Sequence, residues 1–217
     1  AMTAVVGSTG AGKSTLLALA LRLFDPDRGG VELDGVDLRR VRLADLRRHV
    51  AIALQENLLF GTTIRENIRY AGPDAPDAAV RAAARVACAD EFIEALPQGY
   101  DTPLGERGTK LSTARRQRFA LARAVLKEAR ILLLDEPAPS LGAETEARVL
   151  GNLAAWGRGR AILLVTHRLS TVRHADRIAV LDHGHLVESG SHDALLAEAG
   201  GAYRRMLEAD AGAGDRR

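Results

Sequence analysis

Residues 7–14 carry the spacing of a phosphate-binding loop. They read Gly-Ser-Thr-Gly-Ala-Gly-Lys-Ser, which fits the pattern G-x-x-x-x-G-K-[ST] in full. In that pattern the glycines let backbone N–H groups curve around phosphates, the lysine reaches the β- and γ-phosphates, and the hydroxyl ligates Mg²⁺. A glycine-rich turn without a ligand is the alternative, and the complete spacing disfavours it. The residues expected to contact phosphate are Gly7, Ser8, Thr9, Gly10, Ala11, Gly12, Lys13, Ser14 and Thr15.

Two acids follow an apolar run further along the chain. Residues 131–136 read Ile-Leu-Leu-Leu-Asp-Glu, as expected where a buried parallel strand ends at the carboxyl edge of a sheet. Asp135 would hold Mg²⁺, directly or through water, and Glu136 would accept a proton from an attacking water. Such a pair can also be a solvated turn or a helix cap. Its occurrence together with the loop favours the chemical interpretation.

His167 and Gln55 also follow apolar runs. His167 comes after residues 161–165 and Thr166, where a neutral imidazole could contact a γ-phosphate. Gln55 comes after residues 50–54 and could sense Mg²⁺ or the attacking water, so it is both a catalytic and a metal candidate. Each is ambiguous alone. The other five histidines show no metal-ligand spacing with Cys88 and are predicted to be surface or packing residues.

The elements that must position these residues predict an α/β fold. Runs of four or five apolar residues are too short for helices, and they alternate with stretches of helical periodicity, which favours a mainly parallel sheet covered by helices. The predicted strands are 3–6, 50–54, 131–134, 161–165 and 178–181, and the predicted helices lie near 76–88, 113–128, 144–155 and 192–208.

Residues 57–130 contain no convincing strand, which predicts a helical subdomain inserted between Gln55 and the strand at 131–136. The remainder, residues 3–55 and 131–207, would form the catalytic core. From residue 208 onward the chain has no apolar face to bury, so we expect a disordered tail over 208–217.

Composition excludes several classes of protein. The 217 residues include 30 Lys and Arg against 28 Asp and Glu, with no single-sign block, which argues against a nucleic-acid partner. Only 4% are aromatic, too few for a platform on which bases stack. No run approaches the roughly 20 apolar residues that span a bilayer, so a soluble chain is expected. A single cysteine, Cys88, cannot form an internal disulfide and favours a reduced compartment.

Together these residues resemble the nucleotide-binding domain of ABC transporters of the exporter type, over residues 3–207. The most specific stretches are 55–60 with 63–68, 104–108, and 167–172. The resemblance implies a P-loop NTPase fold over residues 1–207, with ATP and Mg²⁺ bound. It also implies ATP hydrolysis that powers export through transmembrane domains, fused upstream or separate, at the cytoplasmic face of a membrane. Gln55 would then lie near those domains, and Glu106 would contact them.

The resemblance further implies a head-to-tail dimer, in which each ATP lies between one phosphate loop and the partner's signature segment. Where the family reads Leu-Ser-Gly-Gly-Gln, residues 111–115 read Leu-Ser-Thr-Ala-Arg. Ser112 could still donate its hydroxyl to the partner's ATP. Thr113 and Ala114 add β-carbons where glycine permits close approach, and Arg115 would either bind phosphate or obstruct closure.

A second departure is Gly142, where the family usually carries an aspartate that links the two sites. Intact catalytic positions with an altered signature match asymmetric exporters best, so we expect a heterodimer in which the partner's signature completes this chain's site. The alternatives are a homodimer, a deliberately mutated signature, a regulatory domain with little turnover, and a soluble ABC ATPase of DNA repair or translation.

A third departure is at the front. The family carries about two strands before the phosphate loop, with an aromatic residue that stacks on adenine, and no aromatic precedes Gly7 in this sequence. The chain is therefore interpreted as N-terminally truncated. We expect ATP affinity to be reduced and to depend on phosphate contacts, and an apolar surface or sheet edge to be uncovered.

Overall fold

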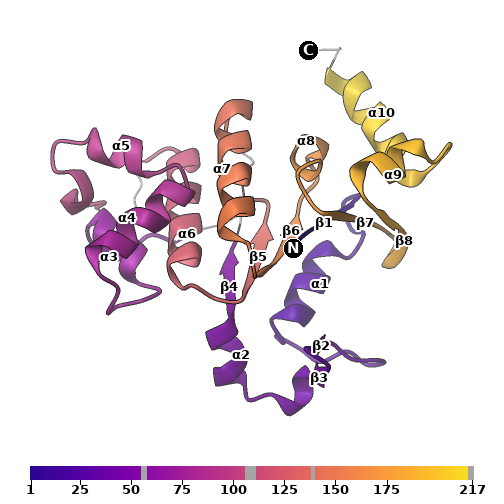
Figure 1. Cartoon of the computed structure of the whole chain (residues 1–217), viewed down its shortest axis with the longest axis horizontal. Helices are drawn as coiled ribbons and strands as arrows, with labels where there is room; N and C mark the ends of the chain where they lie inside the picture. The colour runs from indigo at the N-terminus through magenta and orange to yellow at the C-terminus, as the bar shows by residue number, and fades with distance from the viewer. Residues whose placement is uncertain (55–57, 106–110, 138–139, 215–217) are drawn as a thin grey trace.

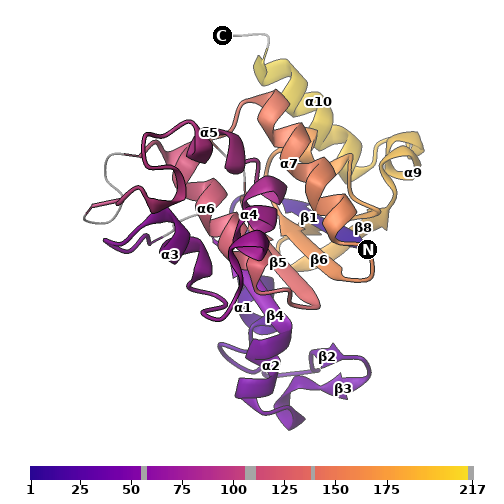
Figure 2. The ribbon, with the colours of Figure 1, turned by 60° about the vertical axis from the view of Figure 1, so that its left-hand side comes forward.

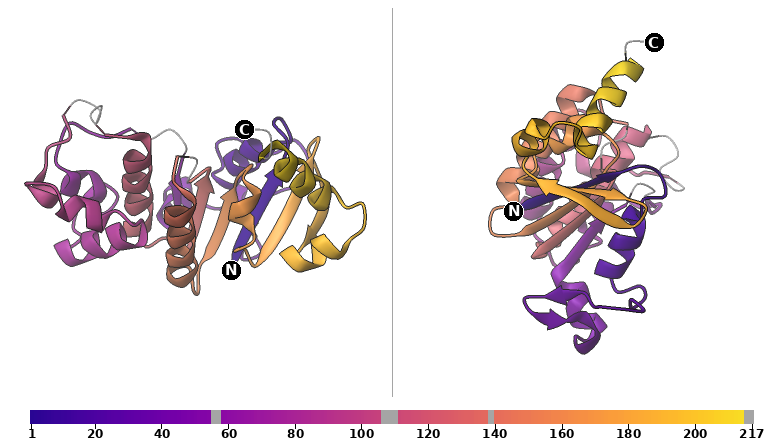
Figure 3. Two further views of the ribbon diagram at one scale, coloured as in Figure 1. Left: turned by 90° about the horizontal axis from the view of Figure 1, so that it is seen from above. Right: turned by 90° about the vertical axis from the view of Figure 1, so that its right-hand side faces the viewer.

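A six-stranded sheet with helices on both faces forms one part of the molecule, and a lobe of helices lies beside it (Figure 1; Figure 3). The computed structural model describes residues 1–54, 58–105, 111–137 and 140–214, without the side chains of 211–214. The strands lie in the order β4-β5-β6-β1-β7-β8, and only β8 runs antiparallel to its neighbour. Their bounds are β1 Met2–Gly7, β4 Val50–Ala53, β5 Ile131–Asp135, β6 Ala161–Val165, β7 Arg177–Asp182 and β8 His185–Gly190.

This architecture confirms the predicted α/β fold with a mainly parallel sheet. All five predicted strands are present, because their short apolar runs are buried between two layers of helices. Two features were not predicted: the edge strand β8, and a hairpin of β2 (Glu32–Leu33) and β3 (Val36–Asp37) that lies with helix α2 at one end of the molecule (Figure 2). These strands are short or polar and expose their side chains, so they lack the apolar runs that mark the central strands.

Alternate residues of the strands face two separate apolar clusters. Val5, Leu133 and Val165 pack toward α1 (Lys13–Ala20) and α2 (Leu43–His49). Their neighbours in the same strands, such as Ala4, Leu134 and Leu164, contribute to the larger cluster. The helices packed on that second face are α7 Ala143–Trp156, α8 Leu169–Val172, α9 His192–Ala197 and α10 Ala202–Gly214.

The helical lobe lies between β4 and β5 in the sequence, as predicted. Its described residues contain no named strand, only an isolated bridge between Thr63 and Pro103. The signature helix α6 is the longest of the lobe and packs against α3, α4 and the edge strand β4. The helices of the lobe are α3 Ile64–Arg69, α4 Asp77–Val86, α5 Asp90–Glu94 and α6 Thr113–Leu126.

The C-terminal region differs from the prediction in two ways. The single helix expected near 192–208 is divided into α9 and α10 at Gly200 and Gly201. Helix α10 then continues to Gly214, so the disordered tail predicted from residue 208 is wrong over 208–214. Residues 208–214 continue a helix that Tyr203 anchors in the core, so the upstream packing extends it.

No helix among the described residues combines the length and the apolar character needed to cross a bilayer. Several large apolar side chains are exposed. Among them are Leu23, Phe24 and Val36 around α1 and the hairpin, and Leu186 and Val187 on the edge strand β8.

Candidate functional site

The sheet register brings three chemically important strand ends together. Asp135 at the end of β5 is aligned with Val165 of β6, and Val165 is aligned with Val5 of β1. The phosphate loop follows β1 directly and leads into α1. The loop, the acidic pair and the residues that follow β6 therefore converge at the carboxyl edge of the sheet, where ligands bind in open α/β folds.

Backbone geometry explains two glycines of the loop. A Cβ at position 7 would lie 2.3 Å from the carbonyl oxygen of Leu181 on the neighbouring strand, so only glycine fits there. Gly12 has a φ of +99°, in the region that favours glycine, and it starts α1 without a side-chain cap among the described residues. The first turn of α1 thus presents its N–H groups and partial positive charge toward the loop, an arrangement suited to an anion.

Lys13 is held across the loop by the loop's own backbone. Its Nζ donates to the carbonyl oxygens of Gly7 at 2.7 Å and Ser8 at 2.9 Å. The next two residues, Ser14 and Thr15, expose their side chains at the start of α1. The ammonium and these hydroxyls therefore face the same region in front of the loop.

Asp135 and Glu136 have different environments although they are adjacent. Asp135 is half-buried, and burial raises the pKa of its carboxyl group, as does the charge of Glu136, while the Lys13 ammonium opposes both. Glu136 is buried and has a φ of +47°, which turns its side chain away from the direction of β5. A non-glycine residue with positive φ persists only where its surroundings hold it.

Three donors hold the Glu136 carboxylate. Oε1 accepts from the backbone N–H of His167 at 2.7 Å and lies 2.6 Å from the His167 ring Nδ1. Oε2 accepts from the Thr166 hydroxyl at 3.1 Å. The Glu136 N–H donates to the carbonyl of Val165, which fixes the strained backbone as well. Glu136, Thr166 and His167 therefore form one hydrogen-bonded unit.

These groups line one cavity of about 360 Å³. None of the described residues that line it is Phe, Tyr or Trp. The lining residues are Thr9, Gly10, Gly12, Lys13, Ser14, Thr15, Asp135, Glu136, Val165 and His167. The structure thus brings together the predicted loop, acids and histidine.

The donor set suits a magnesium ion that is bound with phosphate. No group of three or more His, Cys, Asp or Glu among the described residues could hold a metal by itself. Mg²⁺ usually takes one or two protein oxygens, with water and substrate phosphates completing its octahedron. The Ser14 hydroxyl and the Asp135 carboxylate line the same cavity and match that pattern.

Two predicted residues lie outside the described ranges and one lies elsewhere in the fold. Gln55 and Glu106 are not described, although β4 ends two residues before Gln55. Ser112 does not line the cavity; it is the N-cap of α6 in the helical lobe, and its hydroxyl accepts from the Arg115 N–H at 3.4 Å.

The side chains of the altered signature segment are engaged within the lobe. The Arg115 guanidinium lies over the Phe92 ring, 5.1 Å from its centroid. Arg116 donates to the carbonyl oxygen of Leu111 at 2.7 Å and to the Thr113 hydroxyl at 3.0 Å. Arg115 is therefore directed toward α5.

Sequence reasoning missed Thr166, which bonds the central carboxylate. Its position between an apolar strand and His167 was visible in the sequence, but a threonine there is equally common as a strand-end residue. It also missed Glu146, a buried acid on α7. The sequence did carry a sign of it, because Glu146 has the helical spacing of the apolar residues Val149, Leu150 and Leu153.

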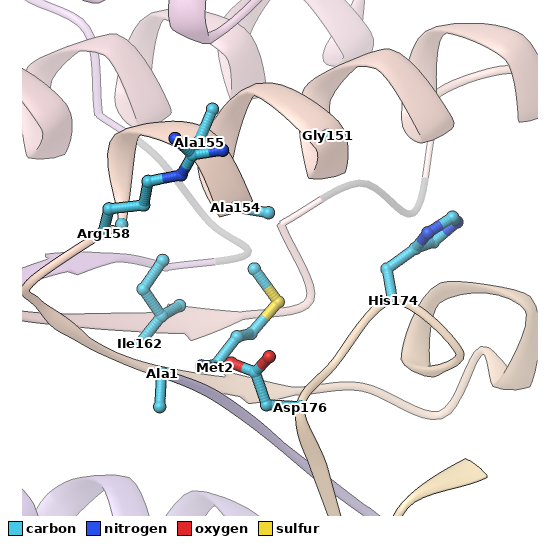
Figure 4. A pocket seen from close by; sticks show the side chains of 10 residues that line it. Ala1, Met2, Gly151, Ala154, Ala155, Arg158, Ile162, His174 and Asp176 are labelled. Atoms are coloured by element: carbon cyan, nitrogen blue, oxygen red, sulfur yellow. Dashed lines mark hydrogen bonds between the residues drawn. The ribbon is translucent and has the colours of Figure 1, made fainter. Parts of the chain in front are cut away.

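A second hollow lies at the opposite, amino edge of β1 and β6, against α7 (Figure 4). Arg158 and His174 stand at its opposite ends, with the Met2 and Asp176 side chains between them. The Asp176 carboxylate already accepts the Met2 N–H at 2.6 Å. Because its remaining lining is mostly small apolar residues, it offers less chemistry than the cavity around Lys13.

Comparisons with known proteins agree with this site. Residues 1–139 match the family model described as "ABC transporter". The chain is 48% identical over 205 residues to the ATP-dependent lipid A-core flippase of Chromohalobacter salexigens, covering 94% of this chain and 35% of the flippase. It is 49% identical over 197 residues to the Beta-(1-->2)glucan export ATP-binding/permease protein NdvA of Rhodopseudomonas palustris, covering 91% of this chain and 33% of that protein.

Among solved structures, the chain is similar to one described as a bacterial Atm1-family ABC exporter with ATP bound. The TM-score is 0.91 at 44% identity, over 96% of this chain and 36% of the exporter. The chain thus spans about a third of the length of these relatives. With a family model over residues 1–139 and a phosphate loop beside the Glu136–His167 pair, the chain belongs to the ABC transporter family, as an ATP-binding domain.

Proposed function

We propose that this chain binds Mg·ATP at the carboxyl edge of its sheet and hydrolyses it, and that the hydrolysis powers export through transmembrane domains. The observation that carries the proposal is the carboxylate of Glu136, held by three donors in the cavity that the phosphate loop lines. The similar proteins, a flippase and a glucan exporter, support export as the purpose. The cytoplasmic face of a membrane is the corresponding location.

Phosphate binding is assigned to the loop. The Lys13 ammonium, now on two loop carbonyls, would move onto the β- and γ-phosphates, since charge-assisted bonds to phosphate are stronger than bonds to neutral carbonyl groups. The backbone N–H groups from Gly10 to Thr15 would bind the remaining phosphate oxygens.

Glu136 is the proposed general base. A carboxylate offers about four lone-pair directions, and His167 and Thr166 occupy three of them. One direction is left to accept a proton from a water positioned in line with the γ-phosphate. The three donors fix the carboxylate while leaving it able to act.

His167 is the proposed γ-phosphate contact, with one refinement. Because the Glu136 carboxylate accepts at Nδ1, that nitrogen carries the proton, and Nε2 of a neutral ring is then an acceptor. A contact from Nε2 to a phosphate oxygen therefore requires an imidazolium, which the Glu136 charge compensates, or a rotation that breaks the pair.

The magnesium ion would be held by Ser14 and Asp135, with Gln55 as a further ligand or sensor of the attacking water. Its contribution is to neutralise charge that develops on the phosphates. Deprotonated Asp135 is needed for that, so binding of Mg²⁺ should weaken as pH falls through the raised pKa of this carboxyl group.

We further propose that the active assembly is a head-to-tail dimer with a different ABC domain, whose signature segment completes this chain's site. The local engagement of Thr113, Arg115 and Arg116 supports a signature that assists hydrolysis poorly at the opposite site. Equal rates of hydrolysis at the two sites of the assembled dimer would contradict this arrangement.

The test uses the complete gene product. Glu136→Gln should retain ATP binding within about threefold and lower Mg-dependent hydrolysis by at least about 100-fold, since general bases contribute 10²–10⁴-fold. Glu144→Gln, an exposed carboxylate on α7, is the control and should hydrolyse normally. Unchanged hydrolysis in Glu136→Gln would remove this residue from the mechanism.

A further inference from the structure

Helix α7 buries a carboxylate that the proposed chemistry does not use. Glu146, in the first turn, is 3% exposed and shares its face with Val149, Leu150 and Leu153, all in the core. An ionised carboxylate in such surroundings is costly unless it is paired and hydrogen-bonded. Its partners therefore indicate why an acid occurs here.

Arg168 and Thr171, which bond the Glu146 carboxylate, both come from the segment that follows His167. The Arg168 guanidinium lies 2.8 Å from Oε2 of Glu146, and the buried Thr171 hydroxyl donates to Oε1. Glu146 thus ties α7 to α8 and to the loop that carries His167.

The same bonds continue to the central carboxylate. The Arg168 N–H donates to the Thr166 hydroxyl oxygen at 3.0 Å, and that hydroxyl donates to Oε2 of Glu136 at 3.1 Å. Each non-covalent contact on the path from Glu146 to Glu136 is within hydrogen-bond distance, and the Arg168 side chain joins its guanidinium to its backbone N–H covalently. The path runs through Arg168 and Thr166.

Glu146 is also fixed through its backbone at the start of α7. Its N–H donates to the carbonyl oxygen of Gly142 at 2.9 Å. Glu136 has a strained backbone, so it needs support from more than one direction. One support comes from β6, and Glu146 anchors the other.

We propose that Glu146 is a positioning residue for Glu136, acting through Arg168 and Thr166. The inference rests on the proposed function, because it assigns Glu146 to the orientation of the same base. The bonds of Glu146 therefore link α7 to the catalytic carboxylate.

The experiment measures Mg-dependent hydrolysis and ATP binding in the complete gene product. Glu146→Gln keeps the size of the side chain but removes its charge. It should lower kcat by about 10- to 100-fold, as expected for a small displacement of a reacting group, and leave the ATP dissociation constant within about twofold. Glu144→Gln, in the same turn but exposed, should change neither quantity.

A double-mutant cycle separates positioning from a general loss of packing. Because Glu146 acts through the Thr166 hydroxyl, Glu146→Gln and Thr166→Val together should lower kcat little more than the larger single loss. Leu150→Ala removes only a packing neighbour. Its effect on kcat should therefore multiply with that of Glu146→Gln in the double variant.

The outcomes distinguish this inference from the proposed function. A wild-type protein that hydrolyses no ATP even when assayed together with the partner ABC domain would overturn both. Hydrolysis that Glu136→Gln abolishes but Glu146→Gln leaves unchanged would overturn only the positioning role. The positioning role would also be overturned if the effects of Glu146→Gln and Thr166→Val on kcat multiplied in the double variant. It would be overturned as well if Glu146→Gln lowered ATP affinity as much as it lowered kcat.

Discussion

The carboxyl edge of the sheet and the start of α6 both carry residues expected to contact ATP, but their side chains are engaged differently. At the edge, Lys13, Asp135 and His167 come from three different strand ends and line one cavity. At the start of α6, Ser112 and Arg115 contact their own turn and Phe92 of the same lobe. The first region is assembled within the chain, whereas the second would become a site only in the proposed dimer.

Removing the Lys13 ammonium is the strongest test of the difference between the two regions. Lys13→Ala should weaken ATP binding by at least about 100-fold, because two charge-assisted bonds to phosphate are lost. Titration with a fluorescent ATP analogue measures it. Lys127→Ala, which removes a lysine bonded to the carbonyl of Val50 on β4, is the control and should stay within about twofold. If Lys13→Ala and the wild type bound the ATP analogue equally well, the phosphates would have to bind elsewhere.

The helical lobe has its own critical polar residue. Asn67 is fully buried, donates to the carbonyl oxygens of Phe60 and Thr63, and accepts from the Phe60 N–H at 2.8 Å. Asn67→Ala should lower the free energy of unfolding by about 3 kcal/mol, because several buried partners lose their bonds.

Denaturant unfolding measures this loss, with Asn152→Ala as the matched control. Asn152 is half-buried and donates to the carbonyls of Arg85 and Val86, so its loss should cost about 1 kcal/mol. Similar costs for the two variants would show that Asn67 does not organise the lobe.

Asp135 provides a pH-dependent test of the sheet edge. Its raised pKa means that the ionised carboxyl destabilises the folded chain, so stability is present at low pH and lost as pH rises through that pKa. Without Mg²⁺ at pH 7, Asp135→Asn should raise Tm by about 2 °C. The gain should vanish at a pH where the wild-type carboxyl is protonated, and the exposed Asp27→Asn should show no such change. A gain independent of pH would contradict the assigned cause.

The smallest expected effect concerns Arg115. Arg115→Gln removes its contact with the Phe92 ring and should cost about 0.5 kcal/mol of stability. The ATP affinity of this chain should stay within twofold, because Arg115 belongs to the opposite region. A tenfold change in the affinity of the phosphate loop for ATP would show that the two regions are not independent.

The sequence predicts the central sheet and most of the candidate site for a physical reason. Buried parallel strands need continuous apolar runs, and the loop, Asp135, Glu136 and His167 each follow such a run or the turn after it. Their meeting at one edge follows from parallel pairing alone.

What the sequence did not reveal depends on tertiary contacts. Thr166 and Glu146 become recognisable only when α7 packs beside the end of β6 and their bonds to Glu136 and Arg168 form. Strand β8 is polar and lies at an edge, so its pattern resembles a loop. The helix over 208–214 continues α10, which packing of Tyr203 nucleates upstream.

The most direct test of the contrast compares two variants of the complete gene product in one assay of Mg-dependent ATP hydrolysis. Glu136→Gln alters the site assembled within the chain, and Ser112→Ala alters the signature segment that we propose faces a partner's nucleotide. We predict a loss of at least about 100-fold for Glu136→Gln and less than about twofold for Ser112→Ala. Equal, large losses from both variants would contradict the account, because the signature of this chain would then complete a hydrolytic site.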